Sequence, residues 1–371
     1  MFFKKNKTVN FLVFVFLIMA FVFTAFFAGC KKEEATVEEP IAVEPEEVVE
    51  EEDVEKIAGI EITGDINILS GLNISDTVGN SRPIAFMVDN NTPARPQSGL
   101  NLADIIFEVV EEGGITRYLA VYSSYDAKTI GPMRSARIYN AEIARSFDPI
   151  YAFWGTYPEG YDIIRNLYMD VLDGNSDVIA YAKSGWRDYS RINPGEEAHT
   201  AFMSTLGIKE DALEYGYSLE GGQSPLRFKI DAIDSAKGNI LDIAINFSNK
   251  DSFKVDFKYN ANENNYSRYL AGAPHTDYET GKQIAVNNVI VMITSIEGPI
   301  DASGHMAVRT TGTSDIGKAF FFMDGNVIEG TWERTSVFDP FKYKDDDGNI
   351  VLLNRGSTWV ALIQDTNRLT Y

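Results

Sequence analysis

Residues 82–148 read RPIAFMVDNNTPARPQSGLNLADIIFEVVEEGGITRYLAVYSSYDAKTIGPMRSARIYNAEIARSFD, and this stretch decides the fold. Short apolar runs of strand length alternate in it with groups of Arg, Asp, Glu and Gly. Apolar runs of this length, bounded by turn residues, are typical of buried β-strands. The polar groups between them exceed what a plain core needs, so the same stretch is expected to carry functional residues.

The patterns over residues 59–220 alternate between strand and helix. Strands are expected at 83–88, 117–123 and 150–154, and helices at 136–146, 159–168 and 196–206. Residues 102–110 have the composition of either a helix start or a strand. Ser135 is the candidate N-cap of the helix that follows it. Alternation at this spacing predicts a mixed α/β layer domain over residues 59–220.

The pattern changes after residues 218–225, SLEGGQSP, which mark the predicted domain boundary between residues 220 and 221. Residues 241–247 and 253–259 alternate apolar and polar side chains, as strands of a hairpin with one buried face do. Asp324-Gly325 marks a further hairpin turn. We therefore predict a mostly antiparallel β domain over residues 221–371, and an α+β fold for the chain.

Residues 1–30 have the pattern of a bacterial lipoprotein signal peptide. Lysines near the start precede an apolar run over residues 11–27, and the segment ends in Phe-Ala-Gly-Cys at residues 27–30. An uncleaved transmembrane helix is the alternative, because the run is about long enough to span a bilayer. Small residues directly before Cys30, the only cysteine, favour cleavage and lipid attachment at Cys30.

Residues 31–58 carry twelve acidic residues and no aromatic residue. Such a segment buries too little apolar surface to offset the entropy lost on ordering, and repulsion between like charges keeps it extended. We predict an acidic disordered tether between the lipid anchor and the folded domains. Specific cation binding by the acidic run is the alternative interpretation.

Composition excludes several classes of function. Acidic residues outnumber basic ones, 54 to 33, for a net charge of −21, which argues against nucleic-acid binding. No nucleophile elbow, P-loop, dinucleotide fingerprint or zinc-protease motif is present. The three histidines, His199, His275 and His305, would have to converge from distant positions to hold zinc. No metal, no cofactor and no catalytic residue is therefore predicted.

The turn at residues 131–137, GPMRSAR, is the strongest local signal for a binding site. Arg134 and Arg137 bracket a predicted helix start, where free backbone N–H groups favour an anion and guanidinium groups suit carboxylate or phosphate. The alternative is internal pairing, in which upstream acids neutralise these arginines and Arg117. The acids available are Asp104, Glu108, Glu111 and Glu112.

Polar residues from this turn and its surroundings form the candidate ligand-binding site. Its members are Arg95, Glu108, Glu111, Arg117, Arg134, Ser135, Arg137 and His199. A strand followed by a helix brings loops to one edge of an α/β layer, where ligands usually bind. We expect the three arginines nearest the turn to lie together, with Arg95 at the rim and Glu108 or Glu111 as counter-charges.

These motifs resemble the core of the YerB-like bacterial lipoproteins. The resemblance is carried by residues 83–89, 95–99, 103–104, 111–117, 131–137, 269–291 and 330–332. It implies a lipid-anchored, two-domain envelope protein with no assigned enzymatic activity, on the outer face of a cell membrane. The chain departs from the family pattern at residues 153–156 and 197–200, which puts the ligand preference of any pocket there in doubt.

Two classes of function fit these observations. The first is a non-enzymatic binding or scaffold module of the cell envelope, whose partner is an envelope protein or a cell-wall-derived ligand. The second is an envelope hydrolase or transferase that uses His199 or paired carboxylates, which catalyse glycosidic chemistry when about 5–10 Å apart. The missing nucleophile motifs favour the first.

Overall fold

A computed structural model of the chain describes residues 59–191 and 193–371. In strand β17 (Gly312–Met323) the description excludes the side chains of residues 313–316. The predicted signal peptide with Cys30 and the predicted tether lie outside the described residues. Within the described ranges, no helix is long and apolar enough to cross a membrane.

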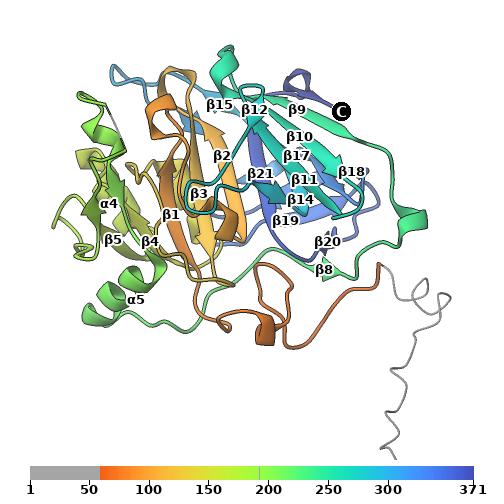
Figure 1. Cartoon of the computed structure of the whole chain (residues 1–371), viewed down its shortest axis with the longest axis horizontal. Helices are drawn as coiled ribbons and strands as arrows, with labels where there is room; N and C mark the ends of the chain where they lie inside the picture. The colour runs from red at the N-terminus through yellow and green to blue at the C-terminus, as the bar shows by residue number, and fades with distance from the viewer. Residues whose placement is uncertain (1–58, 192) are drawn as a thin grey trace, which may run out of the picture. The chain divides into compact units, whose positions relative to one another are not determined.

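A mixed ten-stranded sheet forms the centre of the fold (Figure 1). Its strands, in order across the sheet, are β19 (Lys342–Asp345), β18 (Asn326–Arg334), β17, β14 (Asn288–Ile293), β21 (Thr358–Ile363), β2 (Ile105–Val110), β3 (Thr116–Tyr122), β1 (Ile84–Asp89), β4 (Ile150–Phe153) and β5 (Asp170–Asp173). Strand β21 is parallel to both β14 and β2, and β4 is parallel to both β1 and β5. Strand β3 is antiparallel to both of its neighbours, β2 and β1. The many strands and few helices confirm the predicted α+β fold class.

The central strands of this sheet are covered on both faces. Every residue of β1, β2, β3 and β21 is buried. Near-continuous apolar runs are what such strands require. Residues 102–110, ambiguous in sequence, therefore form β2 after a short 3₁₀ turn at Leu100–Leu102. The β-branched run in β2 pairs with β3 on one side and β21 on the other.

The helices lie towards the β4–β5 end of the large sheet. Among the described residues they are α3 (Ile138–Arg145), α4 (Pro158–Arg165) and α5 (Thr205–Glu214). The predicted cap at Ser135 is wrong, because α3 begins at Ile138 and has no side-chain cap. Residues 134–136 instead stay beside strands: Arg134 N donates to Met87 O (2.9 Å) and Ala136 N to Gly155 O (2.9 Å).

The predicted helix over residues 196–206 is also wrong. That segment holds a 3₁₀ turn (Glu197–His199) and then β7 (Ala201–Phe202), which pairs with β6 (Trp186–Arg187). Helix α5 starts only after Ser204, whose hydroxyl accepts a hydrogen bond from Gly207 N at 3.0 Å. A serine cap in this position fixes the helix start.

A second, six-stranded sheet comes from the C-terminal half. Its members are β12 (Ala273–Pro274), β11 (Asn265–Leu270), β10 (Lys254–Asn260), β9 (Asp242–Asn246), β22 (Leu369–Thr370) and, beside β11, β13 (Ala285–Val286). The predicted alternation is confirmed in β9 and β10, where every second residue is buried. Two-stranded pairs complete the fold: β15 (Ile296–Glu297) with β16 (Ala307–Val308), and β20 (Leu353–Asn354) with β8 (Phe228–Lys229).

The large sheet runs through both predicted domains. Strands β1 to β5 precede residue 221, whereas β14, β17, β18, β19 and β21 follow it, and the two sets meet where β21 pairs with β2. The connecting segment is held to the first half, because Arg82 N donates to Leu219 O (2.8 Å) and Gln223 N to Phe147 O (3.0 Å). The boundary between residues 220 and 221 stays a prediction. Because the large sheet takes strands from both sides of residue 221, neither half of the chain contains the whole sheet.

Candidate functional site

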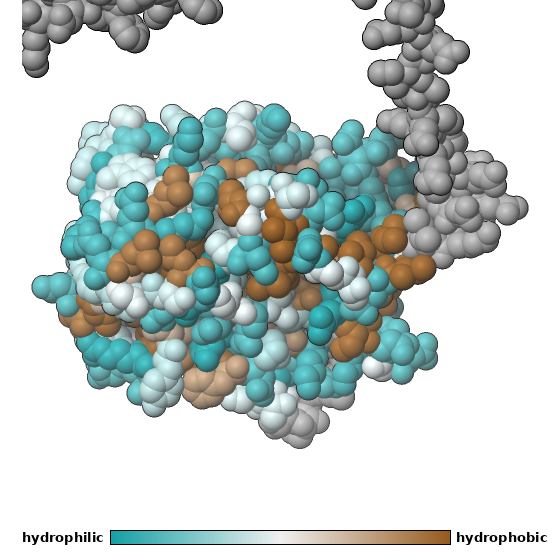
Figure 2. Space-filling model, turned by 90° about the horizontal axis from the view of Figure 1, so that it is seen from below, coloured by the Kyte–Doolittle hydropathy of each residue, from teal (hydrophilic) through white to brown (hydrophobic). Residues whose placement is uncertain are grey.

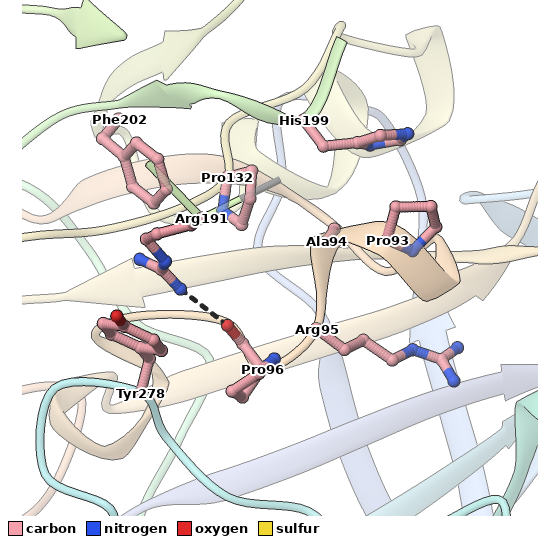
Figure 3. Close-up of a pocket in the computed structure, with 9 residues that line it drawn as sticks. All are labelled: Pro93, Ala94, Arg95, Pro96, Pro132, Arg191, His199, Phe202 and Tyr278. Carbon is pink, nitrogen blue, oxygen red and sulfur yellow. Dashed lines mark hydrogen bonds between the residues drawn. The ribbon is translucent and has the colours of Figure 1, made fainter. Parts of the chain in front are cut away.

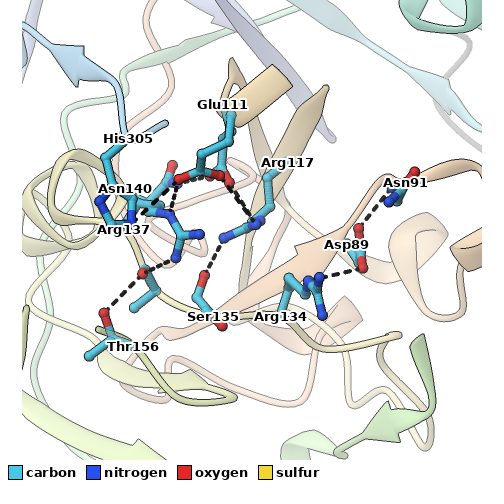
Figure 4. A network of polar contacts seen from close by, with 12 residues as sticks. Asp89, Asn91, Glu111, Arg117, Arg134, Ser135, Arg137, Asn140, Thr156 and His305 are labelled. Atoms are coloured by element: carbon cyan, nitrogen blue, oxygen red, sulfur yellow. Dashed lines mark hydrogen bonds and ion pairs between the residues drawn. The ribbon is translucent and has the colours of Figure 1, made fainter. Parts of the chain in front are cut away.

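Arg117 and Arg137, two of the predicted ligand-binding residues, are engaged in internal ion pairs (Figure 4). Arg117 NH2 lies 2.8 Å from Glu111 Oε2, and both side chains are buried. Arg137 Nε lies 2.5 Å from Glu112 Oε1. Arg117 NH1 also donates to Ser135 O at 2.6 Å. These contacts match the internal-pairing interpretation of the turn, since each guanidinium already has a carboxylate.

Glu111 lies inside this cluster rather than on a cleft wall. Its Oε1 accepts a hydrogen bond from Asn140 Nδ2 at 3.0 Å. Burial raises the pKa of Glu111 to about 7, although the charges of Arg117 and Arg137 act in the opposite direction. A fully buried carboxyl without solvent access is poorly placed to bind an external ligand.

Glu108 ties the two sheets together. Its Oε2 accepts hydrogen bonds from Arg268 NH2 of β11 (2.8 Å) and from Trp359 Nε1 of β21 (3.1 Å), and its Oε1 accepts one from Thr116 (2.7 Å). The side chains of Glu108 and Arg268 are both 0% exposed. Glu108, from the predicted site, is therefore part of a core ion pair between the halves of the chain.

A relay of hydrogen bonds connects this core pair to the end of β1. Arg268 NH1 contacts His275 Nδ1, and because a guanidinium only donates, Nδ1 accepts. The other nitrogen, Nε2, therefore carries the proton and donates to Gln97 Oε1 at 2.9 Å. Gln97 Nε2 then donates to Asp89 O at 2.9 Å. Burial, and next the charges of Arg268 and Arg95, hold the pKa of His275 well below its usual range, as a neutral imidazole requires.

His199 lies beside Asp89 at the end of β1 and lines a cavity. His199 Nδ1 lies 2.7 Å from Asp89 Oδ2, and Arg134 Nε lies 3.3 Å from the same oxygen. Asp89 is 1% exposed. Burial alone would raise the pKa of Asp89, but the hydrogen bond from His199 and the charges of Arg134 and Arg117 lower it below its usual value. Asp89 is thus an ionised carboxylate that holds His199 and Arg134 together.

His199 forms one wall of a cavity of about 220 Å³, which we call the Arg191 pocket (Figure 3). The pocket is lined by Pro93, Ala94, Arg95, Pro96, Pro132, Arg191, His199, Phe202 and Tyr278. The peptide bonds before Pro96 and Pro132 are cis. Three basic residues and no carboxylate line it.

Arg191 is fixed across the pocket by stacking and hydrogen bonds. Its guanidinium lies over the ring of Tyr278, 3.5 Å from the centroid, and 4.9 Å from that of Phe202. NH2 donates to Pro96 O and NH1 to Ser98 Oγ, both at 2.8 Å. No salt bridge to Arg191 is found among the described residues, although the charges of Glu279, Asp188 and Asp277 act on it from a greater distance. Its guanidinium can therefore still contact a ligand directly.

Arg95 lines the same pocket but directs its guanidinium away from it, as Figure 3 shows. NH2 donates to Asn90 O at 2.8 Å and NH1 to Ser252 O at 2.7 Å. The group also stacks on Phe253, 4.7 Å from the ring centroid. Of the predicted site residues, His199 therefore lines the cavity and Arg95 lines it with the stem of its side chain. Arg134 does not line the cavity, but it shares the carboxylate of Asp89 with His199.

The pocket needs residues that the sequence analysis did not select: Arg191, Phe202 and Tyr278. Arg191 is the last residue of an aromatic and basic segment, WRDYSR at residues 186–191, and Tyr278 lies in the family motif at residues 269–291. Gly131, in the predicted turn, packs tightly on this wall: its φ is 147° and an added Cβ would lie 2.8 Å from Ala201 O. The turn motif thus shapes the pocket as well as supplying arginines.

The chemistry of this arrangement is that of a small cationic pocket with apolar walls. Within the described residues, no three His, Cys, Asp or Glu side chains are grouped so that they would hold a metal ion. Arg191 and His199 supply hydrogen-bond donors, whereas prolines and aromatic rings supply the walls. Guanidinium groups recognise carboxylate and phosphate oxygens.

Comparison with known proteins identifies the family. Residues 69–218 match the N-terminal domain, and residues 243–360 the C-terminal domain, of a family described as "Protein of unknown function (DUF3048)". The chain is 32% identical over 308 residues to the "Putative lipoprotein YerB" of Bacillus subtilis (strain 168), which covers 80% of this chain and 86% of that protein. A crystal structure of the YerB protein from Bacillus subtilis superposes with a TM-score of 0.69 at 28% identity, covering 82% of this chain and 98% of that one. The chain therefore belongs to the YerB-like family of two-domain, lipoprotein-like proteins of unknown function.

Proposed function

We propose that this protein is a lipid-anchored component of the cell envelope that binds a small anionic ligand in the Arg191 pocket. The observation that carries the proposal is the placement of charge in the lining: Arg191 and His199 face the cavity and no carboxylate lines it, in a chain with 54 acidic and 33 basic residues. A pocket of the opposite sign to its protein attracts anions against the overall field, which requires specific placement of the cations.

Other cavities support anion binding less well. Glu297 lines one cavity, Glu142 and Asp301 line a second, and Glu61 and Asp65 line a third. On the face shown in Figure 2, apolar side chains lie in several patches interspersed with polar residues. The Arg191 pocket is thus the best-supported ligand site among the described residues.

The test is calorimetric titration with two simple anions, sulfate and acetate, at pH 5.5. We expect at least one of them to bind, and Arg191→Ala to weaken binding at least about tenfold, because hydrogen bonds to charged groups contribute roughly 1.5–3 kcal/mol. Arg165→Ala is the matched control, since Arg165 pairs with Asp162 on the surface of α4. Equal affinity in the Arg191→Ala protein, or no binding of either anion to the wild type, would reject the proposal.

The lipid anchor is part of the same proposal and rests on Cys30 and the segment before it. Several acyl chains hold a protein firmly on a membrane, because each buried methylene contributes about 0.8 kcal/mol. Cys30→Ala should leave an unprocessed precursor that incorporates no labelled fatty acid in cells. Unchanged labelling would show that the lipid, if any, is attached elsewhere.

An envelope hydrolase or transferase is the second candidate, favoured by the Asp89–His199 pair. A histidine held by a buried carboxylate is the arrangement of many general bases. Paired carboxylates gain no such support, because Glu108 and Glu111 are both 0% exposed and both have arginine partners. Release of fragments from envelope polymers by the wild type, but not by His199→Gln, would favour this candidate.

A further inference from the structure

The orientation of His199 determines which of its nitrogens meets a ligand. Asp89 Oδ2 accepts at 2.7 Å, and an ionised carboxylate cannot donate, so Nδ1 carries a proton. The second nitrogen, Nε2, has no hydrogen-bond partner among the described residues. Because His199 lines the Arg191 pocket, Nε2 is the atom left for a ligand. The pair therefore fixes the ring without using its second hydrogen-bonding site.

Charged groups of both signs surround His199 and the Arg191 pocket. Asp89 at the end of β1 is shared between His199 and Arg134, which follows the Gly131-Pro132 turn. The other titratable groups that line the pocket are Arg95, Arg191 and, from the C-terminal half, Tyr278. Glu279, Asp188 and Asp277 lie beyond the lining but close enough to act on the charge of Arg191. A bound anion is therefore stabilised by the cations that face the cavity, Arg191 and protonated His199, and not by a general excess of positive charge.

Resting on the proposed function, we infer that the ligand is an oxyanion that accepts a hydrogen bond from His199 Nε2–H, so that ligand and one proton bind together. In neutral His199, whose Nδ1–H is fixed by Asp89, Nε2 presents a lone pair that repels an oxyanion. Protonation converts this lone pair into a charged donor. Sulfate and acetate represent the two sources of such chemistry, a phosphate-like group and a carboxylate.

The experiment measures anion affinity and proton uptake by calorimetry between pH 5.5 and 8, in two buffers of different ionisation enthalpy. Sulfate does not titrate in this range, so a change in protonation on sulfate binding belongs to the protein. Acetate is partly protonated at the lower end of the range, so its proton uptake is compared at pH 6.5 and above. Affinity should fall about tenfold per pH unit once the free imidazole is neutral, with uptake of about one proton per bound anion. His199→Gln, which keeps a donor for Asp89, should bind weakly and without this pH dependence.

The three histidines make a direct observation possible by NMR of their imidazole rings. We expect the anion to move the imidazole signals of His199, and to leave those of His305, paired with Asp301 away from the Arg191 pocket, unmoved. His305→Gln is the matched control for calorimetry and for signal assignment. Tighter binding of sulfate or of acetate assigns the anionic group, and either result supports the inference if a proton is taken up.

Two outcomes separate the inference from the function on which it rests. Binding that depends on Arg191 but takes up no proton, or that is unchanged in His199→Gln, would overturn the inference and leave anion binding intact. Failure of both anions to bind the wild type at pH 5.5 would overturn the proposed function as well.

Discussion

Replacing Arg268 by methionine tests whether the buried ion pair with Glu108 holds the two halves of the chain together. Methionine fills much of the volume of the arginine stem and keeps an apolar contact with Trp359, over whose ring the guanidinium lies at 4.2 Å. The substitution removes the donor that lies 2.8 Å from Glu108 Oε2. It leaves the carboxylate with Trp359 and Thr116 as its only hydrogen-bond donors among the described residues.

The magnitude follows from burial. Glu108 and Arg268 are both 0% exposed, so the remaining charge has no access to water. Breaking a buried pair by removing one partner costs roughly 3–5 kcal/mol of the free energy of unfolding. Loss of the cation–π contact adds about 0.5–2 kcal/mol. The double variant Arg268→Met/Glu108→Gln should recover at least about 2 kcal/mol, because it removes the uncompensated charge.

Urea unfolding followed by tryptophan fluorescence measures these differences, since Trp359 contacts both residues. Arg165→Met is the matched control, because its ion pair with Asp162 is exposed and contributes little. A loss below about 1 kcal/mol in Arg268→Met, or a double variant no more stable than it, would refute the argument that Glu108 requires its partner.

Two further predictions concern stability and the predicted boundary. Burial raises the pKa of Asp104 to about 6, although Ser123 N and Ser124 N donate hydrogen bonds to its carboxyl group. The protonated Asp104 side chain therefore contributes fully to the free energy of unfolding below pH about 4, and this contribution is lost as the pH rises through about 6. Asp104→Asn should remove about 3 kcal/mol of this pH dependence in unfolding measured from pH 4 to 7, and an unchanged profile would contradict the assignment. Cleavage at a protease site inserted at Gly221 should leave both fragments together on gel filtration, because β21 pairs with β2; separation would show that each half is stable alone.

Local chemistry in the sequence was sufficient to predict many elements. Apolar runs at residues 83–88 and 117–123 became β1 and β3, and alternation at residues 253–259 became β10. The proximity of Arg117 to Glu111 was also predictable, since Glu111 directly follows β2, Arg117 lies in the neighbouring strand β3, and one short turn separates them. Such contacts can be predicted because a short turn between two paired strands determines which residues come to lie opposite each other.

Contacts between distant segments were beyond such reasoning. Glu108 was predicted as a counter-charge for nearby arginines, but its partner is Arg268, 160 residues away. His199 and Asp89 are 110 residues apart, and His199 was a candidate without any sign in the sequence that Asp89 is its partner. Sequence alone does not tell which of several acids an arginine meets, because sheet order decides it. Within the order β21–β2–β3–β1, the pairing of β2 with β3 follows from one short turn, whereas the pairing of β21 with β2 is set by packing between the halves.

The two networks then explain why polar residues are concentrated in residues 82–148. Those that face inwards, such as Glu108, bind the C-terminal sheet, whereas Asp89 at the end of β1 orients the pocket. Gln97 joins the two, because it accepts from His275 and donates to the backbone of Asp89. The Arg191 pocket also needs Tyr278 from the C-terminal half for one wall. The site is therefore complete only when both halves are assembled, so a change such as Arg268→Met should weaken anion binding as well as stability.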